Sequence, residues 1–310
     1  MTEVLRLTNS EMGAWRDDPR FWYLAYYLGL QKKEPMVAGR AITRGNRYHD
    51  ALAEYYDPDK RIHPVVTVEK SIERDLAAAP WQEVDILKEG DLVKAMVEGY
   101  IEWLAEEGED EDLEILATET KVEVPLVDGI NLLSKLDARV QRRSTNRRLA
   151  LEHKSNFYDI VLLQNDTQCL TEHLVEFLDL KEKGEDPHRA EGILYNMARP
   201  VKRTAAAKPP FYKREDVIHN DHELRAHWRH CVSIGNAIQN ARTRLDAGET
   251  HHTVCPPSVS RESTWKNPFL RIYTLMDDGS DWEAAADALY VKGDPLERYW
   301  GVSSYEEVVA

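Results

Sequence analysis

The chain has 310 residues, with a hydrophobic content of 42% and an aromatic content of 9%, as expected of a globular protein with a sizeable core. No apolar run approaches the length of about 20 residues that spans a bilayer, and the first residues lack the pattern of a signal peptide, so we expect no membrane partner. The net charge of −15 argues against a protein that binds nucleic acid without sequence preference, because such proteins usually carry a basic patch.

The cysteine content predicts the compartment. The three cysteines, Cys169, Cys231 and Cys255, are an odd number at wide spacing, which is typical of a reducing cytoplasm and of free thiols. The chain contains no internal repeat and no Ser/Gly-rich linker, so the simplest prediction is one domain over residues 1–310. Its parts would be an N-terminal helical part at 1–89, a core at 90–198 and a C-terminal part at 199–310.

The N-terminal part begins with helix-capping residues at 8–11, followed by an aromatic-rich run at 21–27 and a loop at 31–39. A helix is predicted from about Ala41 to Tyr56, and it carries both Gly45 and His49. The residue pattern at 65–88 predicts one short strand or helix without clear boundaries.

The core alternates between helical and strand patterns. Apolar residues recur every fourth position in a predicted helix at 90–108. Three predicted strands follow at 113–126, 131–143 and 147–155, then a helix at 166–184 and a further strand at 191–198. A turn at 144–146 joins the second and third strands. Beyond the core we expect a basic loop at 200–211, a long helix at 221–247 and an irregular remainder with a short helix near 282–289.

Three polar residues stand out on the second and third strands. Asp137 lies on the former, and Glu152 and Lys154 share one face of the latter because side chains two apart on a strand point the same way. Two carboxylates from neighbouring strands form an oxygen site for a hard divalent cation, and the lysine can orient or activate a water molecule. These groups suit phosphodiester hydrolysis, although an exposed hairpin in a chain that is 31% charged would contain the same residue types.

Basic residues flank these positions on both sides in the sequence. They favour DNA as a partner in spite of the acidic total. The candidates for DNA contact are Arg139, Arg142, Arg143, Arg147, Arg148, Lys202 and Arg203.

The order helix, strand, strand, strand, helix, strand resembles the αβββαβ core of the PD-(D/E)XK nuclease superfamily, an α/β fold whose mixed central sheet is flanked by helices. Here it would carry helical N- and C-terminal additions. The motifs resemble the RecB-type exonuclease branch, which includes nucleases of CRISPR adaptation and phage recombination nucleases. That branch has Gly-x-x-x-His, a Glu on the first strand, Gly-x-x-Asp, Glu-x-Lys and Gln-x-x-x-Tyr. The matching residues are Gly45 and His49, Glu119, Asp137, Glu152 and Lys154, and Gln168.

The resemblance implies a metal centre. Asp137, Glu152, the backbone carbonyl of His153 and an imidazole nitrogen of His49 would bind Mg²⁺ or Mn²⁺, while Lys154 would position or deprotonate the attacking water. Glu119 would bind a second cation or a bridging water, or else be an ordinary exposed strand residue.

The chain departs from the family pattern at several positions. Ser134 replaces the glycine of Gly-x-x-Asp, and Glu172 replaces the tyrosine of Gln-x-x-x-Tyr. Many relatives bind an iron–sulfur cluster through four cysteines, and none of the matching positions is a cysteine here, so we expect no cluster. Those positions are Asp18, Ser263, Asn267 and Tyr273.

The function that the resemblance implies is a Mg²⁺- or Mn²⁺-dependent DNA exonuclease of a bacterial or phage cytoplasm. It would act on free or single-stranded DNA ends in recombination, replication or repair, with a possible partner protein. Two alternatives are a member of the fold that binds DNA or protein with little turnover, and an inhibitor whose acidic surface mimics DNA. The complete set of His49, Asp137, Glu152 and Lys154 favours the enzyme.

Overall fold

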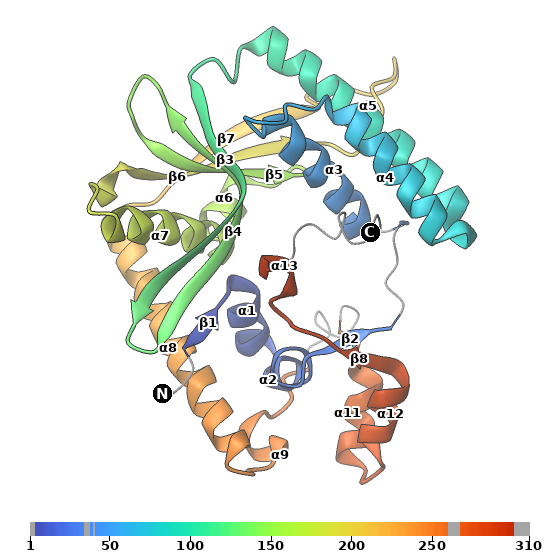
Figure 1. Ribbon diagram of the computed structural model, residues 1–310, viewed down its shortest axis with the longest axis vertical. Helices are drawn as coiled ribbons and strands as arrows, with labels where there is room; N and C mark the ends of the chain where they lie inside the picture. Colours follow the sequence, from blue (N-terminus) through green and yellow to red (C-terminus); the bar gives the residue numbers. More distant parts are fainter. Residues whose placement is uncertain (1–3, 34–37, 40, 260–266, 301–310) are drawn as a thin grey trace. The chain divides into compact units, whose positions relative to one another are not determined.

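The computed structural model describes residues 4–33, 38–39, 41–259 and 267–300 (Figure 1). Packing divides the chain into two compact units, here called unit 1 (residues 1–35, 125–133 and 228–310) and unit 2 (residues 36–124 and 134–227). The organisation as a single domain stays a prediction. The three cysteines are buried, and none of them forms a disulfide.

Unit 2 holds the predicted αβββαβ core. Its longer elements, two of which continue into unit 1, follow the expected order. They are α3 (Ala41–Tyr56), α4 (Pro64–Ala78), α5 (Glu83–Glu107), β3 (Leu113–Val127), β4 (Ile130–Arg142), β5 (Arg148–Lys154), α6 (Ile160–Gln164), α7 (Thr167–Glu182), β6 (Ala190–Ala198) and β7 (Tyr212–Ile218). The α/β fold class is thereby confirmed.

The sheet of unit 2 is mixed, as predicted. Strand β3 pairs with β4, and from there the order is β4, β5, β6 and β7. The pairs β4–β5 and β6–β7 are antiparallel, whereas β5 and β6 are parallel because α7 carries the chain back between them. Each of the two predicted catalytic strands therefore pairs with the other, and β5 lies in the interior of the sheet.

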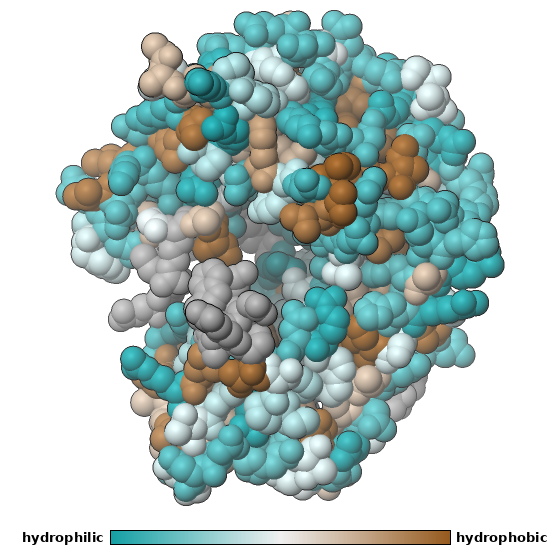
Figure 2. All heavy atoms as spheres, turned by 180° about the vertical axis from the view of Figure 1, so that it is seen from behind, coloured by the Kyte–Doolittle hydropathy of each residue, from teal (hydrophilic) through white to brown (hydrophobic). Residues whose placement is uncertain are grey.

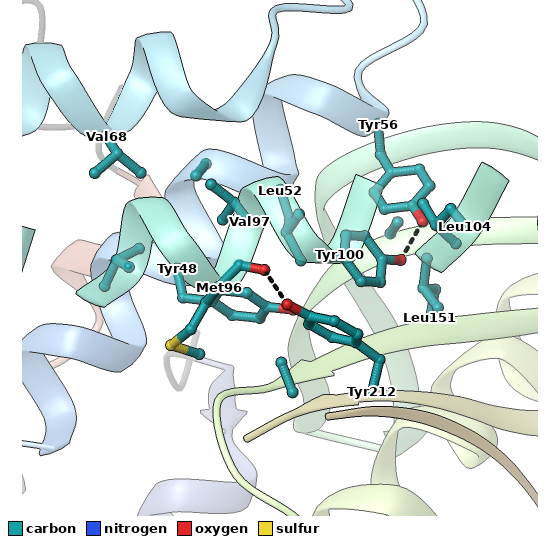
Figure 3. Close-up of a cluster of buried hydrophobic side chains, with 14 of the residues drawn as sticks. Tyr48, Leu52, Tyr56, Val68, Met96, Val97, Tyr100, Leu104, Leu151 and Tyr212 are labelled. Carbon is teal, nitrogen blue, oxygen red and sulfur yellow. Dashed lines mark hydrogen bonds between the residues drawn. The ribbon is translucent and has the colours of Figure 1, made fainter. Parts of the chain in front are cut away.

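Helices α3, α4 and α5 pack together in unit 2, where Figure 1 shows them beside the strands. Their buried side chains meet Ala138, Val140, Leu149 and Leu151 in one hydrophobic core. The Tyr56 and Tyr100 hydroxyl oxygens are 2.5 Å apart within this core. The hydroxyl groups thus remain hydrogen-bonded although buried, as the dashed line in Figure 3 marks. The other face of β4 and β5, which carries Asp137 and Glu152, points away from this core.

The region between the N-terminal part and the core differs from the prediction. Residues 65–88 contain most of α4 and the first six residues of α5, not one short element, and α5 begins at Glu83. The glycine at position 90 does not start the helix but lies inside it. A Cβ atom there would be 2.3 Å from Cδ1 of Ile72, so Gly90 permits the close approach of α4 and α5.

Unit 1 contains short strands and helices from both ends of the chain. Its elements are β1 (Leu5–Leu7), α1 (Asn9–Asp17), α2 (Pro19–Trp22), the π-helical turn η1 (Tyr23–Tyr27), β2 (Leu30–Lys32), most of α8 (Asp221–Asp246), α9 (His251–Val254), α11 (Leu270–Asp277), α12 (Trp282–Leu289), β8 (Tyr290–Lys292) and α13 (Glu297–Trp300). The sequence predicted α8, α12 and the Thr8 cap of α1, but not the three short strands or α11.

Asp18 links the N-terminal helices of unit 1 to its C-terminal segment. The buried carboxylate caps α2 by accepting the amide hydrogen of Arg20 at 3.1 Å, and it also accepts the amide hydrogen of Ser258 at 3.2 Å. The Tyr273 hydroxyl donates to it at 2.8 Å and in turn accepts from Asn267 Nδ2 at 3.0 Å. Three of the four positions that the resemblance matches to cluster cysteines thus lie in one hydrogen-bonded group, while Ser263 falls outside the described residues; the lack of a cluster stays a prediction.

We expect Asp18→Ala to lower the free energy of unfolding by about 2–3 kcal/mol, because it removes a helix cap and leaves buried donors unpaired. Tyr273→Phe should cost about 1 kcal/mol through the loss of one hydrogen bond. Denaturant titration measures both. Asp17→Ala is the matched control, since that neighbouring carboxylate is exposed and pairs with exposed Arg16; equal stabilities of the Asp18 and Asp17 variants would contradict the role of Asp18.

No helix in the described part of the chain is long and apolar enough to cross a membrane. The molecular face in Figure 2 agrees with this finding, since hydrophobic side chains form separate groups among hydrophilic ones.

Candidate active site

The candidate site is built on the β4–β5 hairpin of unit 2. Backbone hydrogen bonds from Arg142 to Arg147 at 2.9 Å and from Asn146 to Arg142 at 2.8 Å close its turn. Asn146 has a φ of 56°, a left-handed conformation that asparagine tolerates. The strand register pairs Ala138 with Leu151, so the next positions along the ladder, Asp137 and Glu152, lie opposite each other. The two acids are therefore side by side, as the sequence predicted.

Asp137 is fixed by contacts from two elements. Its Oδ2 accepts the backbone N–H of His153 at 2.9 Å and lies 3.0 Å from Nδ1 of His49 on α3. Burial alone would raise the pKa of Asp137, but the charge and hydrogen bond of His49 outweigh burial and lower it. Burial lowers the pKa of His49, yet the charge of Asp137 prevails and raises it to about 9. The structure thus brings His49 to the acidic pair.

Glu152, Lys154 and Gln168 form a second set of contacts. Lys154 Nζ donates to Glu152 Oε1 at 2.7 Å and to Gln168 Oε1 at 3.2 Å, and Gln168 Nε2 donates to the same Glu152 oxygen at 2.8 Å. Burial and the charge of Asp137 raise the pKa of Glu152 to about 7. Burial would lower the pKa of Lys154, but Glu152 outweighs burial and raises it, so Lys154 is an ammonium ion at neutral pH.

Glu119 lies on β3 and forms an ion pair with Lys135. Its φ of 49° places a non-glycine residue in the left-handed region, which is uncommon within a strand. Burial raises its pKa, and the negative charge of Asp137 adds to that shift while Lys135 opposes it. Glu119 is therefore close enough to sense the charge at the site, and its role in binding a cation stays a prediction.

The His153 ring lies on the opposite face of β5 from Glu152 and Lys154, as strand alternation requires. Asn196 Nδ2 lies 2.9 Å from its Nδ1 and donates to the Tyr100 hydroxyl at 2.7 Å. Burial lowers the pKa of His153 to about 3, so its ring is neutral. These contacts fix the strand whose His153 carbonyl we predict to bind metal.

The predicted DNA contacts have partners within the protein. Arg139 is buried and forms ion pairs with Glu176 and Asp179. The other six also lie near internal acceptors, which are Asp216 for Arg142, the carbonyls of Glu111 and His188 for Arg143 and Arg147, Glu176 for Arg148, Asp91 for Lys202 and Glu102 for Arg203. Contact of these six with DNA stays a prediction.

The donor set suits a hard cation. In the described ranges, no group of three or more His, Cys, Asp or Glu side chains is arranged to hold a metal ion. Asp137, which is partly buried, and Glu152, which is buried, nevertheless give two carboxylates, and a cation such as Mg²⁺ commonly needs only one or two, with water and substrate phosphate completing its coordination.

Sequence reasoning named Glu172 only as a departure from the Gln-x-x-x-Tyr motif and missed Asn196, although both lie near the site. Glu172 lies one helical turn after Gln168 on α7 and accepts from its Nε2 at 2.8 Å, a contact that the spacing of four residues could have indicated. Asn196, the partner of His153, had no such signal because it comes from a distant strand.

Comparison with known proteins agrees with this geometry. The profile of the PD-(D/E)XK nuclease superfamily matches residues 6–256, which include the site residues on α3, β3, β4, β5 and α7. No curated protein matches the chain significantly. The match covers most of the 310 residues, and the chain belongs to the PD-(D/E)XK nuclease superfamily.

Proposed function

We propose that the protein is a divalent-cation-dependent deoxyribonuclease, an exonuclease that hydrolyses phosphodiester bonds at DNA ends. The observation that carries this proposal is the pairing of the partly buried Asp137 carboxylate with the buried Glu152 carboxylate, with the Lys154 ammonium 2.7 Å from the latter. Membership in a nuclease superfamily supports hydrolysis of nucleic acid. The motif resemblance to recombination nucleases favours DNA ends and a role in recombination, replication or repair.

Asp137, Glu152, the His153 carbonyl and His49 are the groups that would hold Mg²⁺ or Mn²⁺. The bound ion would offset the two carboxylate charges, supply a water of lowered pKa and stabilise negative charge on the phosphate. An imidazole ligand favours manganese. His49 now contacts Asp137 at 3.0 Å, so the same side chain is positioned to orient this carboxylate.

The other side chains of the site have separate proposed roles. Lys154 is an ammonium held between Glu152 and Gln168, so we assign it the orientation of the attacking water and the stabilisation of charge on the phosphate. Glu119, with Lys135 beside it, would bind a second cation or a bridging water. Arg142, Arg143, Arg147, Arg148, Lys202 and Arg203 are the proposed contacts to the DNA backbone.

The test of exonuclease activity is a comparison of linear duplex, linear single-stranded and covalently closed circular DNA, each incubated with Mn²⁺ or Mg²⁺. Release of nucleotides from labelled linear DNA, with the circle left intact, is the expected result. Cleavage of the circular DNA would show that the protein is an endonuclease and not an exonuclease. DNA binding without cleavage under either cation would support a binding member of the fold.

A further inference from the structure

Glu172 is a third acid beside the candidate site, and neither the proposed cleavage nor the family motif gives it a role. It is 2% exposed, and it forms no salt bridge within the described ranges. Its Oε1 accepts from Gln168 Nε2, whereas its Oε2 is buried without a hydrogen-bond partner among the described residues. Burying an acid that forms no direct ion pair is costly, so the position of Glu172 needs an explanation.

The Gln168 amide explains it. Nε2 carries two hydrogens, and they are donated to Glu152 Oε1 and Glu172 Oε1, each at 2.8 Å. The amide oxygen is left to face Lys154 Nζ, at 3.2 Å. The opposite orientation would set the amide oxygen against two acidic groups and the amide nitrogen against an ammonium, so these neighbours select one of the two amide orientations.

Glu172 contacts Gln168 and forms no hydrogen bond with Lys154 itself. Without it, one amide hydrogen of Gln168 would have no acceptor in a buried position, and the amide could turn away from the site. Lys154 would then keep Glu152 as an acceptor but lose the second contact that fixes the direction of its ammonium group.

We propose, on the basis of the proposed nuclease function, that Glu172 is a positioning residue that orients Lys154 through the Gln168 amide. Burial, reinforced by the charge of Glu152, raises the pKa of Glu172 well above its usual range, which favours the neutral acid. A neutral acid presents an acceptor oxygen much as an amide does. Glutamine at position 172 should therefore replace it, whereas leucine, which has no acceptor, should not.

The test compares Glu172→Leu with Glu172→Gln in single-turnover cleavage of labelled DNA. We expect Glu172→Leu to lower the rate by about tenfold to a hundredfold with little change in KM, and Glu172→Gln to stay within about threefold of wild type. In a Gln168→Leu background, Glu172→Leu should lower the rate no further, because the residue acts through that amide. Thr171→Val is the control for helix packing, since Thr171 is buried on the same helix and its hydroxyl contacts Thr167 and His227.

A second readout does not require turnover. Acetylation of Lys154 by a small amine-directed reagent, followed by mass spectrometry relative to partly exposed Lys94, should speed up in folded Glu172→Leu and not in Glu172→Gln. Unchanged acetylation and cleavage in Glu172→Leu, or equal defects in both variants, would overturn the positioning role. If wild-type protein does not cleave DNA, the nuclease proposal fails by itself, and the acetylation rates alone decide the orientation of Lys154.

Discussion

Lys154→Ala and Asp137→Ala should each abolish DNA cleavage, lowering the rate by about a hundredfold or more. The first removes the ammonium that contacts Glu152 and Gln168, and the second removes one of the two carboxylates of the proposed cation site. Both residues lie at a polar site and outside the apolar core, so the fold should survive. The measurement is release of labelled nucleotide, with circular dichroism to confirm folding.

The variants need a matched control. Lys94→Ala removes a lysine of the same unit whose contact is a partly exposed pair with Glu69, and it should cleave like wild type. Asp137→Asn adds a stricter test because it keeps an acceptor for the His153 N–H while removing the charge. Wild-type turnover in either alanine variant would contradict the assignment of DNA cleavage to this site.

His49→Ala should weaken Mn²⁺ binding by about tenfold or more. The imidazole would be lost both as a nitrogen ligand and as the group that holds Asp137 at 3.0 Å. Calorimetric titration of the purified protein with Mn²⁺ measures the affinity. His188→Ala is the control, since that histidine of the same unit is exposed; an unchanged affinity in His49→Ala would leave His49 as an ordinary helix residue.

The hairpin could be predicted because its signals are local. The turn at 144–146 sets the register of two apolar strands, and strand alternation then places Glu152 and Lys154 on one face. Asp166 likewise predicted the start of α7, and its side chain accepts the backbone N–H of Gln168 there. Short-range rules of capping and periodicity were sufficient for these elements.

The sequence was less informative where tertiary packing decides the structure. Gly90 is typical of a helix boundary, yet it lies inside α5 because Ile72 leaves no room for a side chain. Strand β7 is rich in charged residues and was missed, since its pairing with β6 supplies the stabilisation that local preference lacks. Arg139 was predicted from the sequence to contact DNA, and only the folded chain brings it to Glu176 and Asp179.

The central claim is that the Asp137, Glu152 and Lys154 site cleaves DNA with the help of a divalent cation. The most direct measurement is wild-type cleavage of end-labelled linear DNA after treatment with EDTA, and again after addition of Mg²⁺ or Mn²⁺, with Asp137→Asn assayed in parallel. We expect no cleavage in EDTA, recovery in wild type with at least one of the two cations, and no recovery in the variant. Cleavage that persists in EDTA, or that Asp137→Asn retains in full, would contradict the claim.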